Sequence, residues 1–418
     1  MLRSFIAIAC CLTAFATACP AQSTPEVTIS LMADAPATTA QTQEDVQKWV
    51  GQFEETIYRM RIHDFLERVD WRSIIQAGLS EGGEPPDEAK LEKMTKGMQV
   101  MSERMFPQLR PFFQFSKVEI RKIEADKDKM NLVTRCHDVD GIECKCRWWL
   151  VKAGEAWRLV DFENVTVAMR LSTLMNMAFQ SQASSSPMNR ELSMKFMQFG
   201  TLTEDGDFET ALKIANELEK EKLPRSLLEI IQLAKVDILM ALDKEEEAEP
   251  LLAQLEKQQC TNPAFYLLRA GRFFDLENYE ASLVWSEKYG KAIGHDADSW
   301  RMVVNCHQEL DQDKEALQAA KMWAADYPRD SSPLYFQWSL LPEVRRTLEV
   351  RPLLMHLPHA ESFEAFGEAA LMEDDYDAIR LLVDVMKARK MEREETVEWE
   401  AVLKDAPEGK PAEKKPEK

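Results

Sequence analysis

Three cysteines and one histidine lie close together in the first half of the chain, as Cys136-His137 and Cys144-x-Cys146. Thiolates and imidazoles are common zinc ligands, so a metal site is one interpretation. The Asp140-Gly141 dipeptide between the two pairs favours a tight β-hairpin, in which neighbouring side chains point to opposite faces. Cys136 and His137 then cannot both join the other cysteines, and the alternatives are a cross-strand disulfide from Cys136 or free buried thiols. We expect no metal and no cofactor.

Other candidate chemistry is sparse. His356-x-x-His359 lies among prolines and lacks the HExxH arrangement, and no phosphate loop, nucleophile elbow or dinucleotide fingerprint occurs. Asp161 has no identifiable partner base, which favours a hydrogen-bonding role at a strand end over general-base catalysis. Aromatic and apolar residues that could line a ligand cavity, or form ordinary core, are Trp148, Leu150, Trp157 and Phe162.

The elements that must hold these residues change character along the chain. Apolar residues at spacings of three and four predict a helix from Gln43 with Thr42 as its N-cap, a helical block over 65–75, and a helix over 88–105 that ends near Pro107. Four β-rich runs joined by turn residues follow, at 117–123, 130–138, 142–151 and 156–169. Helices followed by a four-stranded meander predict an α+β domain.

The helical block at 65–75 and the closing strands CRWWLVKAGEAWRLVDFENVTVAMRLS resemble the nuclear-transport-factor-2-like cone fold. The strand 157–161, with Val165 and Val167 after it, is also similar to the end of the periplasmic MlaC family, which carries phospholipids. The resemblance implies a sheet curled round an apolar cavity under covering helices. Enzymes with this fold place Asp, His or Tyr inside the cavity, but no Asp-His dyad matches here, so an enzyme is the least favoured interpretation.

The second half of the chain repeats at a step of 34 residues, which is the tetratricopeptide period. Small residues recur where antiparallel helices must approach closely. The aligned columns are Gln232/Tyr266/Trp300, Val236/Ala270/Val304, Leu239/Phe273/His307, Ala248/Ser282/Ala316, Leu252/Ser286/Ala320 and Leu255/Tyr289/Trp323.

This region resembles tetratricopeptide-repeat proteins, with Trp300, Ala316 and Pro328 at the family's aromatic, alanine and closing-proline positions. We predict at most five hairpins, one of them irregular between Leu334 and Pro358. The resemblance implies a groove for a peptide or a partner helix, although the residues do not reproduce the family's carboxylate clamp. Groove residues are expected to be Tyr266, Arg269, Phe273, Trp300 and Asn305.

The N-terminus has the order of a secretory signal peptide, with Arg3 before a short apolar run and small residues. Cleavage would leave a periplasmic or extracellular protein. A lipid anchor at Cys19 is the alternative, because Ala16-Thr17-Ala18-Cys19 resembles a lipoprotein cleavage box. The predicted order is a signal peptide (1–21), a flexible spacer (22–43), a cone-like α+β domain (44–172), a linker (173–190), an all-α region of tetratricopeptide-type helical hairpins (191–400) and a disordered tail (401–418).

The formal charge of −20 argues against a nucleic-acid partner, since phosphate binding depends on clustered Lys and Arg. No apolar stretch after the leader is long enough to span a membrane. The sequence therefore favours an exported, non-enzymatic binding or scaffold protein whose helical groove takes a protein or peptide. A carrier of a lipid or other apolar molecule in the cone-like domain is the alternative.

Overall fold

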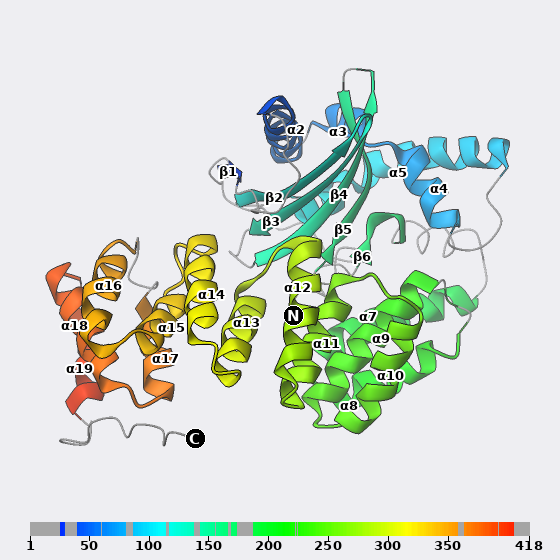
Figure 1. The fold of residues 1–418 in the computed structure, drawn as a ribbon. Coiled ribbons are helices and arrows are strands. Elements are labelled where there is room, and N and C mark those ends of the chain that lie inside the picture. The colour runs from blue at the N-terminus through cyan, green and yellow to red at the C-terminus, as the bar shows by residue number, and fades with distance from the viewer. Residues whose placement is uncertain are drawn as a thin grey trace. The chain divides into compact units, whose positions relative to one another are not determined.

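The computed structural model describes residues 26–29, 40–59, 61–80, 87–113, 117–137, 143–154, 156–165, 169–173, 187–221, 223, 225–357, 363–391 and 393–404. It shows an α+β region followed by a long run of helices, as the sequence predicts (Figure 1). By compactness the chain divides into two units, residues 1–269 with 291–294 and residues 270–290 with 295–418. Among the described residues, no helix is both long and apolar enough to cross a bilayer.

The sheet has the strand order β1-β2-β3-β4-β5-β6. Its four long strands are consecutive and antiparallel, which confirms the predicted meander, and β1 pairs in parallel with β2. The strand β1 falls inside the segment predicted to be a flexible spacer, whose other described part is the start of α2. The strands are β1 (Glu26–Ile29), β2 (Lys117–Asp126), β3 (Lys129–His137), β4 (Glu143–Ala153), β5 (Ala156–Asn164) and β6 (Met169–Arg170).

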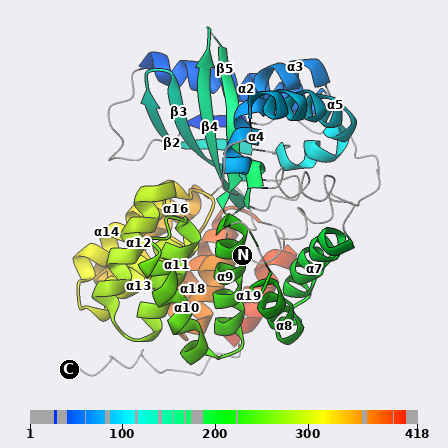
Figure 2. The same ribbon diagram turned by 90° about the vertical axis from the view of Figure 1, so that its right-hand side faces the viewer.

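Four helices cover one face of this sheet (Figure 2). They are α2 (Ala40–Tyr58), α3 (Ile62–Arg68), α4 (Trp71–Ser80) and α5 (Glu88–Phe113). The helical block predicted at 65–75 is split into α3 and α4, because the Asp70 backbone N–H donates to the Leu159 carbonyl of β5 and leaves the helical path. The Asp70 carboxylate then accepts from the backbone N–H and hydroxyl of Ser73 at the start of α4. Helix α5 continues past Pro107, where the sequence placed its end.

Six consecutive helical hairpins follow among the residues that the structure describes, one more than the sequence predicted. Each hairpin consists of two successive helices, and α19 follows the last hairpin. The six are α7/α8, α9/α10, α11/α12, α13/α14, α15/α16 and α17/α18. Their bounds are α7 (Pro187–Glu204), α8 (Phe208–Leu218), α9 (Arg225–Ala241), α10 (Glu245–Lys257), α11 (Pro263–Asp275), α12 (Tyr279–Ile293), α13 (Ala297–Glu309), α14 (Asp313–Asp326), α15 (Ser332–Leu340), α16 (Glu343–Met355), α17 (Glu364–Met372), α18 (Tyr376–Ala388) and α19 (Arg393–Lys404).

The turns inside the hairpins repeat the 34-residue step in backbone geometry. Asp243, Glu277 and Asp311 follow the first helices of three successive hairpins, and each has a positive φ of 55–57°. Such residues end a helix in the left-handed region and let the chain reverse. Five residues after each turn, Ala248, Ser282 and Ala316 are fully buried, so the small-residue column predicted for close helix approach is confirmed as a packed position.

The irregular hairpin predicted between Leu334 and Pro358 is α15/α16. Leu357 is the last residue described there, and Pro358 lies outside the described residues. Pro342 stands between the two helices, and Pro352 lies inside α16. The leader with Cys19, the Asp140-Gly141 turn, most of the predicted linker and the tail after Lys404 lie outside the described residues.

Candidate functional site

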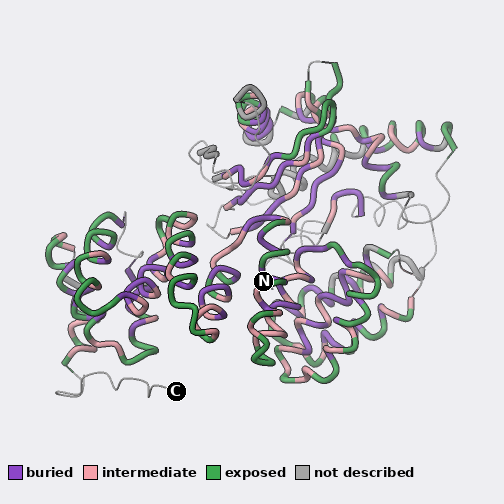
Figure 3. Tube along the Cα trace, in the orientation of Figure 1, coloured by how far each residue is buried: buried purple, intermediate pink, exposed green. Residues whose placement is uncertain are grey.

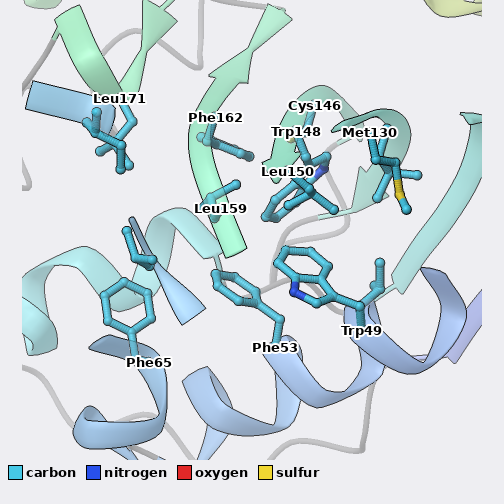
Figure 4. Packing of buried hydrophobic residues seen from close by; sticks show 14 of the residues in the cluster. Trp49, Phe53, Phe65, Met130, Cys146, Trp148, Leu150, Leu159, Phe162 and Leu171 are labelled. Carbon is cyan, nitrogen blue, oxygen red and sulfur yellow. The ribbon is translucent and has the colours of Figure 1, made fainter. Parts of the chain in front are cut away.

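The residues predicted to line a ligand cavity come together on the helix-covered face of the sheet. Trp148, Leu150 and Phe162 are buried, and Trp157 is half-buried against the same cluster. The centroid of the Trp148 ring lies 4.7 Å from the ring centroid of Phe162 and 5.7 Å from that of Phe53 on α2. Figure 4 shows Phe53 pointing from its helix toward these strand residues. Aromatic side chains from α2 thus pack directly against the predicted lining.

Hydrogen bonds fix two indoles in this cluster. The Nε1–H of Trp148 donates to Thr134 Oγ1 at 2.8 Å, and the Nε1–H of Trp49 donates to the Trp157 carbonyl at 2.9 Å. Both donors would otherwise be buried without water, which is costly. The sequence indicated neither partner, because Thr134 is simply one of several alternating strand residues.

The three cysteines share this face. Cys136 on β3 is paired directly with Cys144 on β4, and Cys146 is two residues farther along β4, with its Sγ 3.9 Å from that of Cys144. All three are buried free thiols. His137 is paired with Glu143 in the adjacent register position, whose side chains face the other way. Within the described part of the chain, no group of three or more side chains suited to a metal ion is found.

The three thiols differ in their surroundings. Burial raises the pKa of Cys136 and of Cys146 well above that of a free thiol. Hydrogen bonds from Cys136 and then from Cys146 lower the pKa of Cys144, which is also the most accessible of the three at 8% exposure. Cys144 is therefore the group most readily ionised in this cluster.

The opposite face of the sheet carries charged residues that are nevertheless buried. Glu163 on β5 is paired with Arg147 on β4 at 3.1 Å and lies 3.8 Å from the Arg170 guanidinium. Both guanidinium groups also lie over the Trp149 ring, at 5.6 and 4.9 Å from its centroid. Burial raises the pKa of Glu163, although the two arginines act in the opposite sense. Sequence reasoning missed this network, because charged strand residues usually face solvent.

Asp161 lies beside this network and has the hydrogen-bonding role that the sequence favoured. Its carboxylate accepts from the backbone N–H groups of Phe162 and Ser172, at 2.9 and 3.0 Å, and from the Ser172 hydroxyl at 2.7 Å. Burial raises its pKa. These contacts attach the chain after β6 to the end of β5.

Two lysines on the same face bind the carbonyls at the end of α12, in the compact unit that also holds the sheet. Lys122 Nζ donates to the Lys291 carbonyl at 2.8 Å, and Lys145 Nζ donates to the Gly294 carbonyl at 2.7 Å. Cations at a helix C-terminus complement its partial negative charge. No sequence signal separated these lysines from the other surface cations.

The predicted groove residues fall in both compact units and are of two kinds. Arg269 is buried and paired with Glu249 and Glu256 of α10, and Trp300 is buried with its Nε1–H donating to Asp326 on α14. These two side chains are occupied by packing between helices. The other three, Tyr266, Phe273 and Asn305, are half-buried.

Helix α16 carries an apolar surface that the sequence analysis did not single out. Val344 is 83% exposed and Leu348 is 76% exposed, and Met355 lies on the same side of the helix. The opposite side holds Val350 and Leu354, which are fully buried. Most of the α16 trace is accordingly exposed in Figure 3. The helix thus has two apolar faces, and the described part of its own compact unit covers one.

A scan against protein-family models and a search of curated proteins found no match to this chain. The fold alone defines its class, an α+β domain followed by a run of helical hairpins.

Proposed function

We propose that this chain is an exported, non-enzymatic binding protein whose helical hairpins are of the tetratricopeptide type and dock a protein partner. The exposed apolar stripe on α16, formed by Val344, Leu348 and Met355, carries the proposal. The 34-residue spacing of Asp243, Glu277 and Asp311 supports the repeat class.

The stripe is unusual for its position in a hairpin. In the equivalent second helix α18, the exposed side carries charged residues instead, among them Asp377, Arg380 and Asp384. In α16, Val344, Leu348 and Met355 lie along one side of the helix, with Arg351 between the last two, which is a spacing that an opposing helix can recognise. Large apolar side chains gathered in this way mark interaction surfaces more often than chance exposure does.

The charges on α16 indicate the chemistry of the partner. Arg351 stands between Leu348 and Met355 on the stripe, and Arg345 lies at its edge, where it is paired with Glu349. An amphipathic helical segment with apolar residues at spacings of three and four and an acidic residue opposite Arg351 fits this surface. The whole chain has a formal charge of −20, but α16 itself holds three arginines and two glutamates.

A site-specific photo-crosslinker tests the proposal. Placed at Leu348 in cells that make the protein, it should give one dominant protein adduct, identified by mass spectrometry. A crosslinker at Glu246, an exposed residue of the equivalent helix α10, should not give that adduct. The same set of adducts from both positions would show that the stripe is ordinary surface.

Purified components then measure the effect of the stripe. Leu348→Ser should weaken binding of the identified partner at least tenfold, because a Leu buried at an interface contributes about 1.5–3 kcal/mol. The melting temperature should stay the same, since the side chain touches little of its own fold. Unchanged affinity would rule out this surface.

A further inference from the structure

The geometry points to Cys136 and Cys144 as a cross-strand dithiol that closes to a disulfide by exchange with an external disulfide, leaving Cys146 as a neighbouring thiol. The pair lies in the core of the sheet domain. It has no part in the proposed docking surface, so a negative result for one proposal leaves the other unaffected.

Strand register selects this pair among the three possible ones. Cys136 and Cys144 are directly opposite in an antiparallel pair, where Cα atoms are about 4.5–5.5 Å apart, inside the usual disulfide range. Cys136 and Cys146 are diagonal neighbours, about 7–8 Å apart and too far. Cys144 and Cys146 are two residues apart on one extended strand, about 6.6–6.8 Å, at the limit of that range.

The environment assigns an order to the exchange. Cys144 is the more accessible sulfur, and its thiolate attacks one sulfur of the external disulfide, releasing the other as a thiol that takes the Cys144 proton. Cys136 then attacks Cys144 Sγ, and the second external thiol leaves with the Cys136 proton. Two protein thiols are thus oxidised and one external disulfide is reduced to two thiols.

Neighbouring groups suit this step. The Thr134 hydroxyl lies 3.1 Å from Cys136 Sγ and can receive a hydrogen bond from it or donate one to its thiolate. Cys146 Sγ lies 3.9 Å from Cys144 Sγ but stays a thiol, because a bond between these two residues would be at the limit of disulfide geometry. Two external thiols reopen the Cys136–Cys144 bond by the reverse exchange and leave as one disulfide.

Trypsin allows a direct test on the intact chain. Cleavage after Arg135, Lys145 and Arg147 places Cys136 and Cys144 in one peptide, 136–145, and Cys146 in a separate dipeptide. The folded protein is equilibrated in glutathione buffers from fully reduced to fully oxidised, then denatured in an alkylating reagent and digested.

In the oxidising buffers, peptide 136–145 should lose two hydrogens and carry no alkyl group, while Cys146 and Cys260 remain alkylated. Cys260 is a matched control, because burial raises its pKa to about 12 and its thiol donates to Glu229, with no other cysteine beside it in the described part of the chain. Cys146→Ser should close as readily as the wild type, because Cys146 takes no part in the exchange. A peptide 136–145 that stays fully alkylated, or one joined to residue 146, would overturn the assignment.

Discussion

Glu163 combines burial with an ion pair, and the balance between them sets how it responds to pH. The carboxylate is 3% exposed, and its contacts with Arg147 and Arg170 do not compensate fully for desolvation, because its pKa remains raised. A raised carboxyl pKa means that the folded state binds the proton more tightly than the unfolded chain does. The contribution of Glu163 to stability is therefore present at low pH and is lost as pH rises through the folded pKa.

Glu163→Gln removes this titration while keeping an acceptor for an arginine. The unfolding free energy of the wild type relative to the variant should rise as pH falls from 7 toward 4.5, by at most about 1.4 kcal/mol per pH unit. Urea denaturation of both proteins across this range measures the difference. Glu124→Gln is the control, since the Lys122 hydrogen bond lowers the pKa of that carboxyl. Its stabilising contribution is lost only at more acidic pH, so the difference between wild type and Glu124→Gln should not rise over this range.

A constant difference between the wild type and Glu163→Gln at all these pH values would contradict the linkage. So would a difference that falls toward acid, because Glu163 would then be stabilised in its charged form.

The hairpin is the element that the sequence specified best. The 34-residue step and the small residues at 248, 282 and 316 follow from patterns of local geometry and burial. The meander of four strands in the sheet was predicted from patterns of the same kind. The α16 stripe did not emerge, because an exposed leucine and a buried leucine look alike in a periodic pattern. The buried charges of Glu163 and Lys145 were missed because their burial depends on segments distant in sequence.

Glu277 tests the turn between the helices of a hairpin. It is exposed and has a positive φ of 57°, a conformation that costs an ordinary residue about 1–2 kcal/mol and costs glycine little. Glu277→Gly should keep or slightly raise the melting temperature. Glu277→Val should lower it, because a β-branched side chain tolerates this region poorly.

Thermal unfolding gives the melting temperatures of Glu277→Gly and Glu277→Val for comparison with the wild type. Equal melting temperatures would mean that the turn relaxes out of the left-handed region at little cost, and the backbone spacing would then not constrain the repeat.

At the scale of the whole molecule, the run of hairpins needs a cover at its end, since each hairpin buries its faces on its neighbours. Helix α19 supplies one for α17 and α18. Trp399 packs on Gly367, where an added Cβ would come within 2.3 Å of the indole ring, and Val402 and Leu403 join the same cluster. The glycine at 367 therefore makes room for the covering helix.

A chain ending at Lys390 should lose at least about 2 kcal/mol of stability and should self-associate, because the face that Trp399 covers becomes exposed. A chain ending at Lys404 keeps α19 and is the matched control. Calorimetry and light scattering compare the two with the full chain. Two truncations with the same stability would mean that α19 is not a structural cover.

The regular spacing of the hairpin turns has a mechanical consequence. Under tension applied through the chain ends, repeats that rest mainly on their neighbours come apart one at a time rather than together. Each release should lengthen the chain by the contour of one repeat, about 110–120 Å for 34 residues before the folded length is subtracted. Such a region would lengthen in steps, equal for the repeats spaced by 34 residues and different for the irregular hairpin α15/α16.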